Sequence, residues 1–356
     1  MRDVLIYTYN YDLDPLGLTP NALLHMTSDF DKFRDADATK IAIVEYDYCD
    51  TSQVRSTIDR LESLAFADLV IFKSIEGNTN VDAIVQHTDR SNFVFFLGYV
   101  PERKPTKAKI VYDSYWLKAT ANFYLSDYNT FNVNFDMCRT KDIPFEVLYG
   151  VDKPHRRFVR DCINSNPAFL ESKFLETNSV HNDSYGNPSD IFWQDGVVRN
   201  DELDVVTYLG VDMMASQVIP SKVYNKTAYS VVCETDYRNQ FMFPTEKIAK
   251  PMIAGRLFIA ISGWKYLQGL HELGFKTFGS IIDESYDQIE DDHTRWKAAI
   301  DEAVKLSKLE QAEVLQRCAH IFAHNQEQLI KLQYPYFVLE RYVEEYVASL
   351  PSCVLA

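Results

Sequence analysis

The stretch Lys40–Lys73, KIAIVEYDYCDTSQVRSTIDRLESLAFADLVIFK, decides the fold class of the chain. It begins and ends with short runs of β-branched and aromatic residues, which are typical of strands buried on both faces. A strand, a helix and a second strand in this order predict two parallel strands joined by a crossover helix. The helix is indicated by apolar residues at helical spacing, namely Val54, Ile58, Leu61 and Leu64.

The same alternation continues on both sides of this stretch and predicts a first α/β half. Its expected strands are Val4–Tyr9, Lys40–Glu45, Asp68–Lys73, Asn92–Leu97 and Ala108–Tyr112. Its expected helices are Ser52–Ala65 and Asn80–His87. We place the end of this half near 136–144, a polar segment that ends in a helix-resisting proline.

A second α/β half follows. Its expected strands are Phe145–Gly150, Ala228–Glu234 and Leu257–Ser262. Its expected helices are His155–Ile163, Thr245–Ala254, Trp264–Leu273, Asp287–Lys308, Glu310–Leu332 and Tyr334–Leu350. We therefore predict parallel-sheet domains at 1–140 and 141–333, with 334–356 returning to the first. Open α/β sheets bind ligands at the carboxyl ends of their strands, so we expect a cleft there.

Composition excludes several classes of protein. The 356 residues carry a net charge of −15 and no long basic run, which argues against a general attraction to nucleic acid. Six scattered cysteines without C-x-x-C spacing indicate reduced thiols and a cytoplasmic location. The chain opens directly on a strand-like run and has no apolar stretch of membrane-spanning length, so we expect neither a signal peptide nor a membrane span.

The segment from Ser230 to Leu270 is the clearest candidate for a binding site. A strand ends in Glu234, a polar loop follows, and Phe243–Gly255 reads as a helix with Thr245 as its N-cap and Lys247 in its first turn. Free N–H groups at a helix N-terminus attract phosphate, and a nearby lysine adds positive charge. An ordinary capped helix between two strands is the alternative.

A second phosphate-binding candidate lies at Leu148–Val159, where a strand and a loop with Gly150 precede a helix. That helix opens on His155, Arg156 and Arg157. A guanidinium pairs well with phosphate oxygens. The alternative is a basic first turn on a solvated helix, which the helix dipole disfavours.

These blocks resemble the donor site of the fucosyltransferase-like group of GT-B glycosyltransferases. The order and spacing match over about forty residues that include Val232–Glu234, Asn239, Phe243, Thr245–Ile248, Pro251, Gly255, Ile259 and Ser262–Gly263. The resemblance implies two Rossmann-like domains that face a central cleft, with a nucleotide-sugar donor (UDP- or GDP-sugar) in the second domain. It implies no obligatory metal.

The resemblance also implies roles for single residues. Glu234 would contact ribose or sugar hydroxyls, and Lys247 the diphosphate. Glu246 would orient Lys247 or the sugar, and Arg156 or Arg157 would reach the donor phosphates.

The catalytic base is an open question, because the first half departs from the family pattern. Inverting transfer requires a carboxylate or histidine that deprotonates the acceptor hydroxyl. We favour Glu45 or Glu76, which follow strong strands, and Gly77 suits a close approach of a ligand. The other candidates are Asp12, Asp14, Asp47 and Asp113.

Metal sites are weaker hypotheses. The D-x-D pairs Asp12/Asp14 and Asp35/Asp37 are more typical of loop acids in so acidic a chain. His320 and His324 share a helix face but have no evident third ligand.

The acceptor is equally open. The composition and the segments Gly274–Phe278 (an expected strand) and Ile282–Asp287 resemble phage-encoded members of the group. That resemblance suggests hydroxymethylated cytosine in double-stranded DNA as acceptor, with an arabinosyl- or glucosyl-type transfer in the host cytoplasm. The best prospect for a DNA contact is the cluster Arg103, Lys104, Lys107 and Lys109, although such a cluster is more typical of a solvated loop. The rival acceptor is a glycan or lipopolysaccharide.

Two further classes of protein remain as alternatives. One is a non-catalytic nucleotide-sugar-binding protein. The other is a dinucleotide-using enzyme, which is weakened because no G-x-G-x-x-G follows the first strand.

Overall fold

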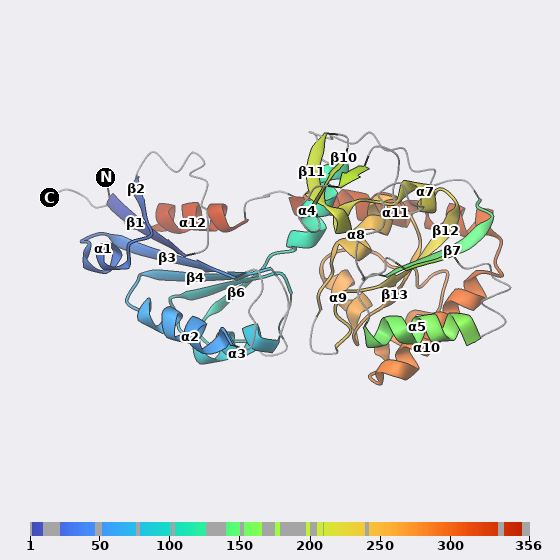
Figure 1. The fold of residues 1–356 in the computed structure, drawn as a ribbon, viewed down its shortest axis with the longest axis horizontal. Helices are drawn as coiled ribbons and strands as arrows, with labels where there is room; N and C mark the ends of the chain where they lie inside the picture. The colour runs from blue at the N-terminus through green and yellow to red at the C-terminus, as the bar shows by residue number, and fades with distance from the viewer. Residues whose placement is uncertain are drawn as a thin grey trace. The chain divides into compact units, whose positions relative to one another are not determined.

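The prediction of an α/β protein with a parallel sheet in each half is confirmed (Figure 1). The computed structural model describes residues 2–9, 22–46, 52–75, 79–99, 101, 104–125, 140–149, 153–165, 175–178, 197–199, 205–208, 210–238, 242–333 and 338–350. Two compact units emerge. Unit 1 is Met1–Tyr115 with Tyr334–Ala356, and unit 2 is Trp116–Gln333.

Unit 1 contains a six-stranded sheet in the order β2-β1-β3-β4-β5-β6, and all of its strand pairs are parallel. The strands are β1 (Arg2–Tyr9), β2 (Ala22–Thr27), β3 (Thr39–Glu45), β4 (Leu69–Ser74), β5 (Phe93–Leu97) and β6 (Lys109–Tyr112). The helices are α1 (Phe30–Asp35), α2 (Val54–Ser63), α3 (Thr79–His87) and α12 (Val338–Ser349). The five expected strands are present, whereas β2 and α1 were not predicted.

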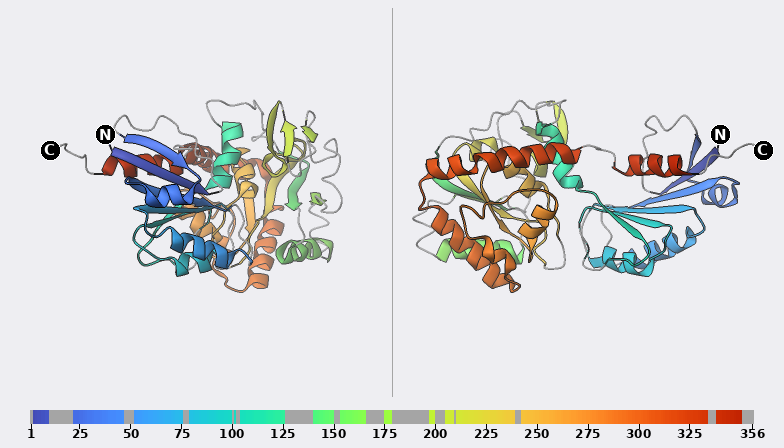
Figure 2. Two further views of the ribbon diagram at one scale, coloured as in Figure 1. Left: turned by 60° about the vertical axis from the view of Figure 1, so that its left-hand side comes forward. Right: turned by 180° about the vertical axis from the view of Figure 1, so that it is seen from behind.

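The C-terminal helix α12 belongs to the core of unit 1. Leu339, Val343 and Val347 are buried against strand residues such as Ile43 and Ile71. Figures 1 and 2 show α12 on one face of the sheet and α2 and α3 on the other. Both faces of this parallel sheet are thereby covered, as its almost continuous apolar strands require.

Unit 2 is built around a parallel sheet in the order β13-β12-β7-β8. Its strands are β7 (Ile143–Tyr149), β8 (Leu175–Asn178), β12 (Thr227–Cys233) and β13 (Phe258–Ile261). A separate antiparallel sheet contains β9 (Val197–Arg199), β10 (Val205–Tyr208) and β11 (Val211–Met214). The helices are α4 (Tyr115–Leu125), α5 (Pro154–Ser165), α7 (Ser221–Tyr224), α8 (Glu246–Ile253), α9 (Tyr266–Glu272), α10 (Asp292–Leu306) and α11 (Gln311–Gln333), with 3-10 turns η1 (Ala215–Gln217) and η2 (Glu284–Gln288).

The chain passes from unit 1 to unit 2 at Tyr115–Trp116, earlier than the 136–144 segment that the sequence indicated. The reason is α4, whose apolar residues lie in the core of unit 2. The Tyr124 hydroxyl also accepts a hydrogen bond from the Ile219 N–H at 2.9 Å. Pro144 lies inside β7, so the proline marks a strand and not a linker.

The expected strand at Gly274–Phe278 is wrong: this segment has no regular structure. Its backbone groups bond to a side chain in place of a neighbouring strand. The Lys276 N–H donates to Asn325 Oδ1 at 2.9 Å, and Asn325 Nδ2 donates to the Lys276 carbonyl at 2.9 Å. Asn325 is 1% exposed, so α11 holds the segment through a buried amide.

We expect Val343→Ala to lower the free energy of unfolding by roughly 2 kcal/mol, because it leaves a cavity between α12 and the first sheet. Chemical denaturation measures the effect. Glu345→Ala is the matched control, since Glu345 lies on the exposed side of the same helix and makes a surface ion pair with Arg341. Equal effects of the two substitutions would contradict the packing of α12 against the sheet.

Candidate anion-binding site at the carboxyl edge of the second sheet

The candidate site lies where β7, β12 and β13 end and where α5 and α8 begin. The loop after β12 runs directly against the end of β13. A Cβ atom at Gly263 would lie 2.4 Å from the Arg238 carbonyl oxygen, so only glycine permits this contact. Two segments of the site are therefore held together backbone to backbone.

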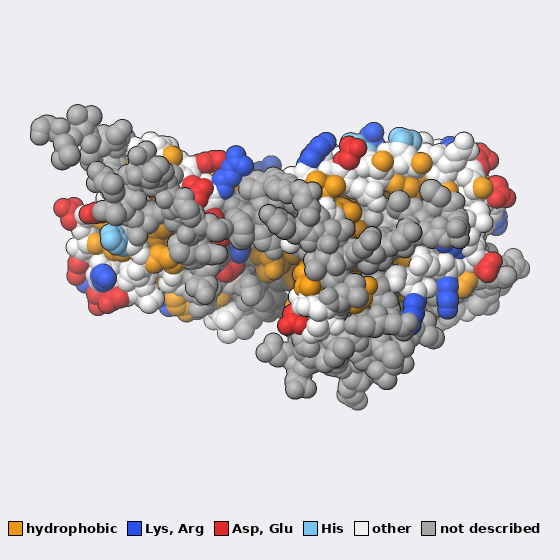
Figure 3. All heavy atoms as spheres, turned by 90° about the horizontal axis from the view of Figure 1, so that it is seen from above, with side chains coloured by type: hydrophobic (Ala, Val, Ile, Leu, Met, Phe, Trp, Pro, Cys, Tyr) orange, Lys and Arg blue, Asp and Glu red, His pale blue; other side chains and the backbone are white. Residues whose placement is uncertain are grey.

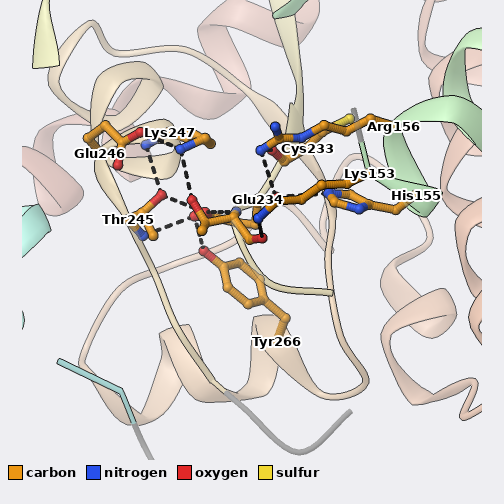
Figure 4. Close-up of polar contacts among 10 residues, drawn as sticks. Lys153, His155, Arg156, Cys233, Glu234, Thr245, Glu246, Lys247 and Tyr266 are labelled. Carbon is orange, nitrogen blue, oxygen red and sulfur yellow. Dashed lines mark hydrogen bonds and ion pairs between the residues drawn. The ribbon is translucent and has the colours of Figure 1, made fainter. Parts of the chain in front are cut away.

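Glu234, the residue after β12, is the anchor of the site (Figure 4). Its side chain is completely buried, and its carboxylate accepts four hydrogen bonds. The donors are Thr235 N (2.9 Å), Thr245 N (3.1 Å), Thr245 Oγ1 (2.6 Å) and the Tyr266 hydroxyl (2.7 Å). Four donors satisfy the buried carboxylate.

The contacts of Glu234 fix the start of α8. Thr245 is the N-cap of that helix, and its Oγ1 accepts a hydrogen bond from Lys247 N at 3.3 Å. Because the same hydroxyl donates to Glu234, the carboxylate sets the position of the cap and of the first helical turn. In this structure Glu234 positions the site and has no exposed oxygen for a ligand hydroxyl.

The basic residues at the start of α5 point at the carbonyl groups that end β12. Lys153 Nζ donates to Thr235 O at 2.6 Å, and His155 Nε2 contacts Glu234 O at 2.8 Å. Arg156 Nη2 donates to Glu234 O at 3.2 Å. These donors tie the start of α5 to the two residues that follow β12.

Burial separates the two arginines that the sequence left open. Arg156 is 3% exposed and lies inside, whereas Arg157 faces solvent. Burial also lowers the pKa of His155 to about 3, helped by Arg156, so its ring is neutral at pH 7. With Nε2 donating to the carbonyl, Nδ1 is a buried acceptor without a hydrogen-bond partner among the described residues.

Lys247 is the cation of α8 that reaches the surface of the site. Its side chain is 26% exposed, its Nζ donates to Thr235 Oγ1 at 2.8 Å, and it forms an ion pair with Glu246. Glu246 is buried, with a side chain only 6% exposed. Lys153, which directly precedes α5, and Lys247 of α8 thus both donate to Thr235.

Two further charged residues, Glu146 and Arg256, are buried in unit 2. Glu146 on β7 is 2% exposed, and burial raises its pKa to about 7 although Arg256 and Lys250 oppose the shift. Arg256 is buried and donates to Ser230 Oγ, Thr227 Oγ1 and the carbonyls of Tyr224, Thr227 and Tyr229. These contacts join α7, β12 and the end of α8.

The other predicted site residues are either not described or belong to unit 1. Glu76, Gly150 and Asn239, like Asp12, Asp14, Asp47 and Arg103, are outside the described residues. Glu45 lies at the carboxyl end of β3 in unit 1, where it forms an ion pair with Lys73 at 2.7 Å, each side chain being 15% exposed. Its role as a base stays a prediction.

Residues of the hypothetical metal sites also make other contacts. Asp35 pairs with Arg34, and His324 Nε2 contacts the Gly274 carbonyl at 2.8 Å. Within the described part of the chain, no group of three His, Cys, Asp or Glu side chains is placed to hold a metal ion. No helix among those residues is long and apolar enough to cross a membrane.

Sequence reasoning missed Tyr266 and Lys153. Tyr266 lies 32 residues after Glu234, and no local pattern pairs the two. Lys153 directly precedes the basic first turn of α5, and its positive charge beside Arg156 and Arg157 is the sequence signal that could have identified it as a site residue.

Comparisons with known proteins add little to this picture. No protein-family model matches the chain, and no curated protein matches it. Among solved structures, the chain is similar to the crystal structure of an α1,3-fucosyltransferase, with a TM-score of 0.36 and 11% identity. The similarity covers 91% of this chain and 90% of that one. At this level a likeness says nothing about activity, which must be argued from the site.

We expect Tyr266→Phe to destabilise unit 2 by about 1.5–3 kcal/mol, because it removes a hydrogen bond to a buried carboxylate. Tyr229→Phe is the matched control: the Tyr229 hydroxyl is buried without a hydrogen-bond partner among the described residues. Thermal and chemical unfolding compare the two. A loss for Tyr229→Phe as large as that for Tyr266→Phe would refute the anchoring role of Glu234.

Glu146 predicts a pH dependence of stability. Its pKa is raised to about 7 in the folded protein, so the folded state holds the proton more tightly than the unfolded chain. This stabilisation is complete below the unfolded pKa near 4.5 and is lost as pH rises through 7. Between pH 5 and pH 8 the wild type should therefore lose about 1–3 kcal/mol of unfolding free energy relative to Glu146→Gln, which has no carboxyl group to titrate at this position. Glu313→Gln, an exposed acid on α11, should show no such shift.

Proposed function

We propose that unit 2 binds the diphosphate of a nucleotide sugar at the carboxyl edge of its sheet, and that the protein is a glycosyltransferase. The carrying observation is the start of α8, which Glu234 fixes from inside while the partly exposed ammonium of Lys247 remains at the surface. A fixed helix N-terminus with an adjacent ammonium is suited to phosphate oxygens.

The surroundings of Lys247 support an anionic ligand. Lys153 approaches the same Thr235, and the exposed guanidinium of Arg157 belongs to the first turn of the neighbouring helix. Arg156 acts behind them, on the carbonyl of Glu234, the residue directly after β12. We assign Lys247, Lys153 and Arg157 to the phosphates, and Glu234, Thr245, His155 and Arg156 to positioning.

The resemblance of the Val232–Gly263 block to fucosyltransferase-like donor sites supports a nucleotide sugar over a simple phosphate. Gly150 and Asn239 belong to the same proposal on that ground alone. The donor is then a UDP- or GDP-sugar, and the sugar passes with inversion to an acceptor hydroxyl in unit 1. Glu45 and Glu76 are the proposed bases there.

The acceptor that charge favours is a glycan or lipopolysaccharide hydroxyl. The net charge is −15, and on the face in Figure 3 the described Lys and Arg side chains lie apart, among acidic ones. DNA binding by phosphate neutralisation needs a basic surface. Hydroxymethylated cytosine in DNA stays the second candidate, with Lys104 and Lys107 as exposed contacts and a flipped-out base.

Binding measurements on UDP, GDP and their sugars test the donor site. A ligand at about 100 times its Kd should stabilise the wild type by about 2.7 kcal/mol. Lys247→Gln should weaken that Kd by about 10–100-fold, since it removes a charge-assisted contact. Lys331→Gln, an exposed lysine on α11, should leave it unchanged.

Binding by neither nucleotide would refute the donor-site proposal. Donor binding without turnover on glycan or hydroxymethylcytosine acceptors would favour a non-catalytic nucleotide-sugar-binding protein.

A further inference from the structure

Charged side chains of opposite sign gather around the first turns of α8, namely Glu246, Lys247 and Lys250 of the helix and Glu146 of β7. Glu246 forms an ion pair with Lys247, and the charge of Lys250 also stabilises its carboxylate. Lys250 in turn interacts with Glu146. One buried carboxylate therefore interacts with two ammonium groups, of which only that of Lys247 is in direct contact with it.

The position of Glu246 on the helix is as notable as its partners. It is the first residue of α8, and its carboxylate also bonds to its own backbone N–H. Helix N-termini carry a partial positive charge and free N–H groups, which is why they hold external anions. The Glu246 carboxylate lies where such an anion would lie.

Lys250 completes this arrangement. It follows Glu246 by four residues, so both lie on one side of α8, and helical side chains lean towards the N-terminus. Its ammonium has no hydrogen-bond partner among the described residues, and burial lowers its pKa to about 8. The side chain is partly buried, and an anion with several oxygens would offer its ammonium charge-assisted hydrogen bonds.

Glu246 is held in the charged form. Burial would raise its pKa, yet Lys247 and Lys250 together keep it below its usual value. A diphosphate carries more charge and more acceptor oxygens than one carboxylate, so it can satisfy both ammonium groups better.

We propose that the carboxylate of Glu246 is an internal competitor of the diphosphate, which displaces it and takes over Lys247 and Lys250. The inference rests on the proposed function and adds Lys250 as a second phosphate-binding lysine. It differs from a role of Glu246 in contacting ribose or sugar, because a contacting residue strengthens binding and a competitor weakens it.

The test measures Kd values of inorganic pyrophosphate, UDP and GDP for the full-length protein and Glu246→Gln. The amide keeps the size of the side chain and removes its charge. We expect all three ligands to bind about tenfold more tightly to Glu246→Gln. Glu272→Gln, which removes an exposed charge on α9, should leave the three values unchanged.

A second arm tests Lys250. In a Lys250→Met background, Glu246→Gln should tighten pyrophosphate binding by less than about threefold, because one of the two released ammonium groups is missing. A gain that stays about tenfold in this background would remove Lys250 from the site. If Lys250→Met does not fold, the comparison of pyrophosphate, UDP and GDP binding between wild type and Glu246→Gln still tests the role of Glu246.

Three results overturn the inference. Tighter pyrophosphate with weaker UDP and GDP would make Glu246 a nucleoside contact. Kd values that are the same for wild type and Glu246→Gln would mean that Glu246 does not compete with the ligand. If the wild type still bound UDP or GDP in that case, the proposed donor site would stand. If neither wild type nor Glu246→Gln bound UDP or GDP, the donor site itself would fail.

Discussion

The buried carboxylate of Glu234 is the interaction on which the candidate site depends. It collects donors from the loop after β12, from the cap of α8 and from α9, so three segments share one acceptor group. An unpaired carboxylate would be very costly at this depth, and each donor therefore becomes obligatory. The position of the α8 N-terminus is therefore set by the need of the buried Glu234 carboxylate for hydrogen-bond donors.

The basic residues of α5 apply the same constraint from the other side. His155 and Arg156 act on the Glu234 carbonyl, and Lys153 on the next one along the chain. Side chain and backbone of a single residue are thus held from opposite directions. A site fixed in this way loses little conformational entropy when a ligand binds, which is the advantage of preorganisation.

Much of this fold is predictable because strand burial leaves a strong local pattern. The apolar runs at β3, β4 and β12 needed no tertiary information. The segment Gly274–Phe278 shows where the pattern fails. It has strand-like composition, but Asn325, about fifty residues later, satisfies its backbone, and no local signal announces a partner so distant.

The site was predictable in its elements and not in the direction of its side chains. Adjacent helical residues differ by about 100° around the axis, so one position decides that Arg156 is buried and Arg157 is exposed. The sequence predicts Glu234 as a loop acid that contacts a ligand, yet its carboxylate oxygens accept hydrogen bonds from Tyr266 and Thr245. Sequence gives the inventory of charges at a helix start. Which of them faces a ligand is settled by the buried donors and acceptors that must be paired first.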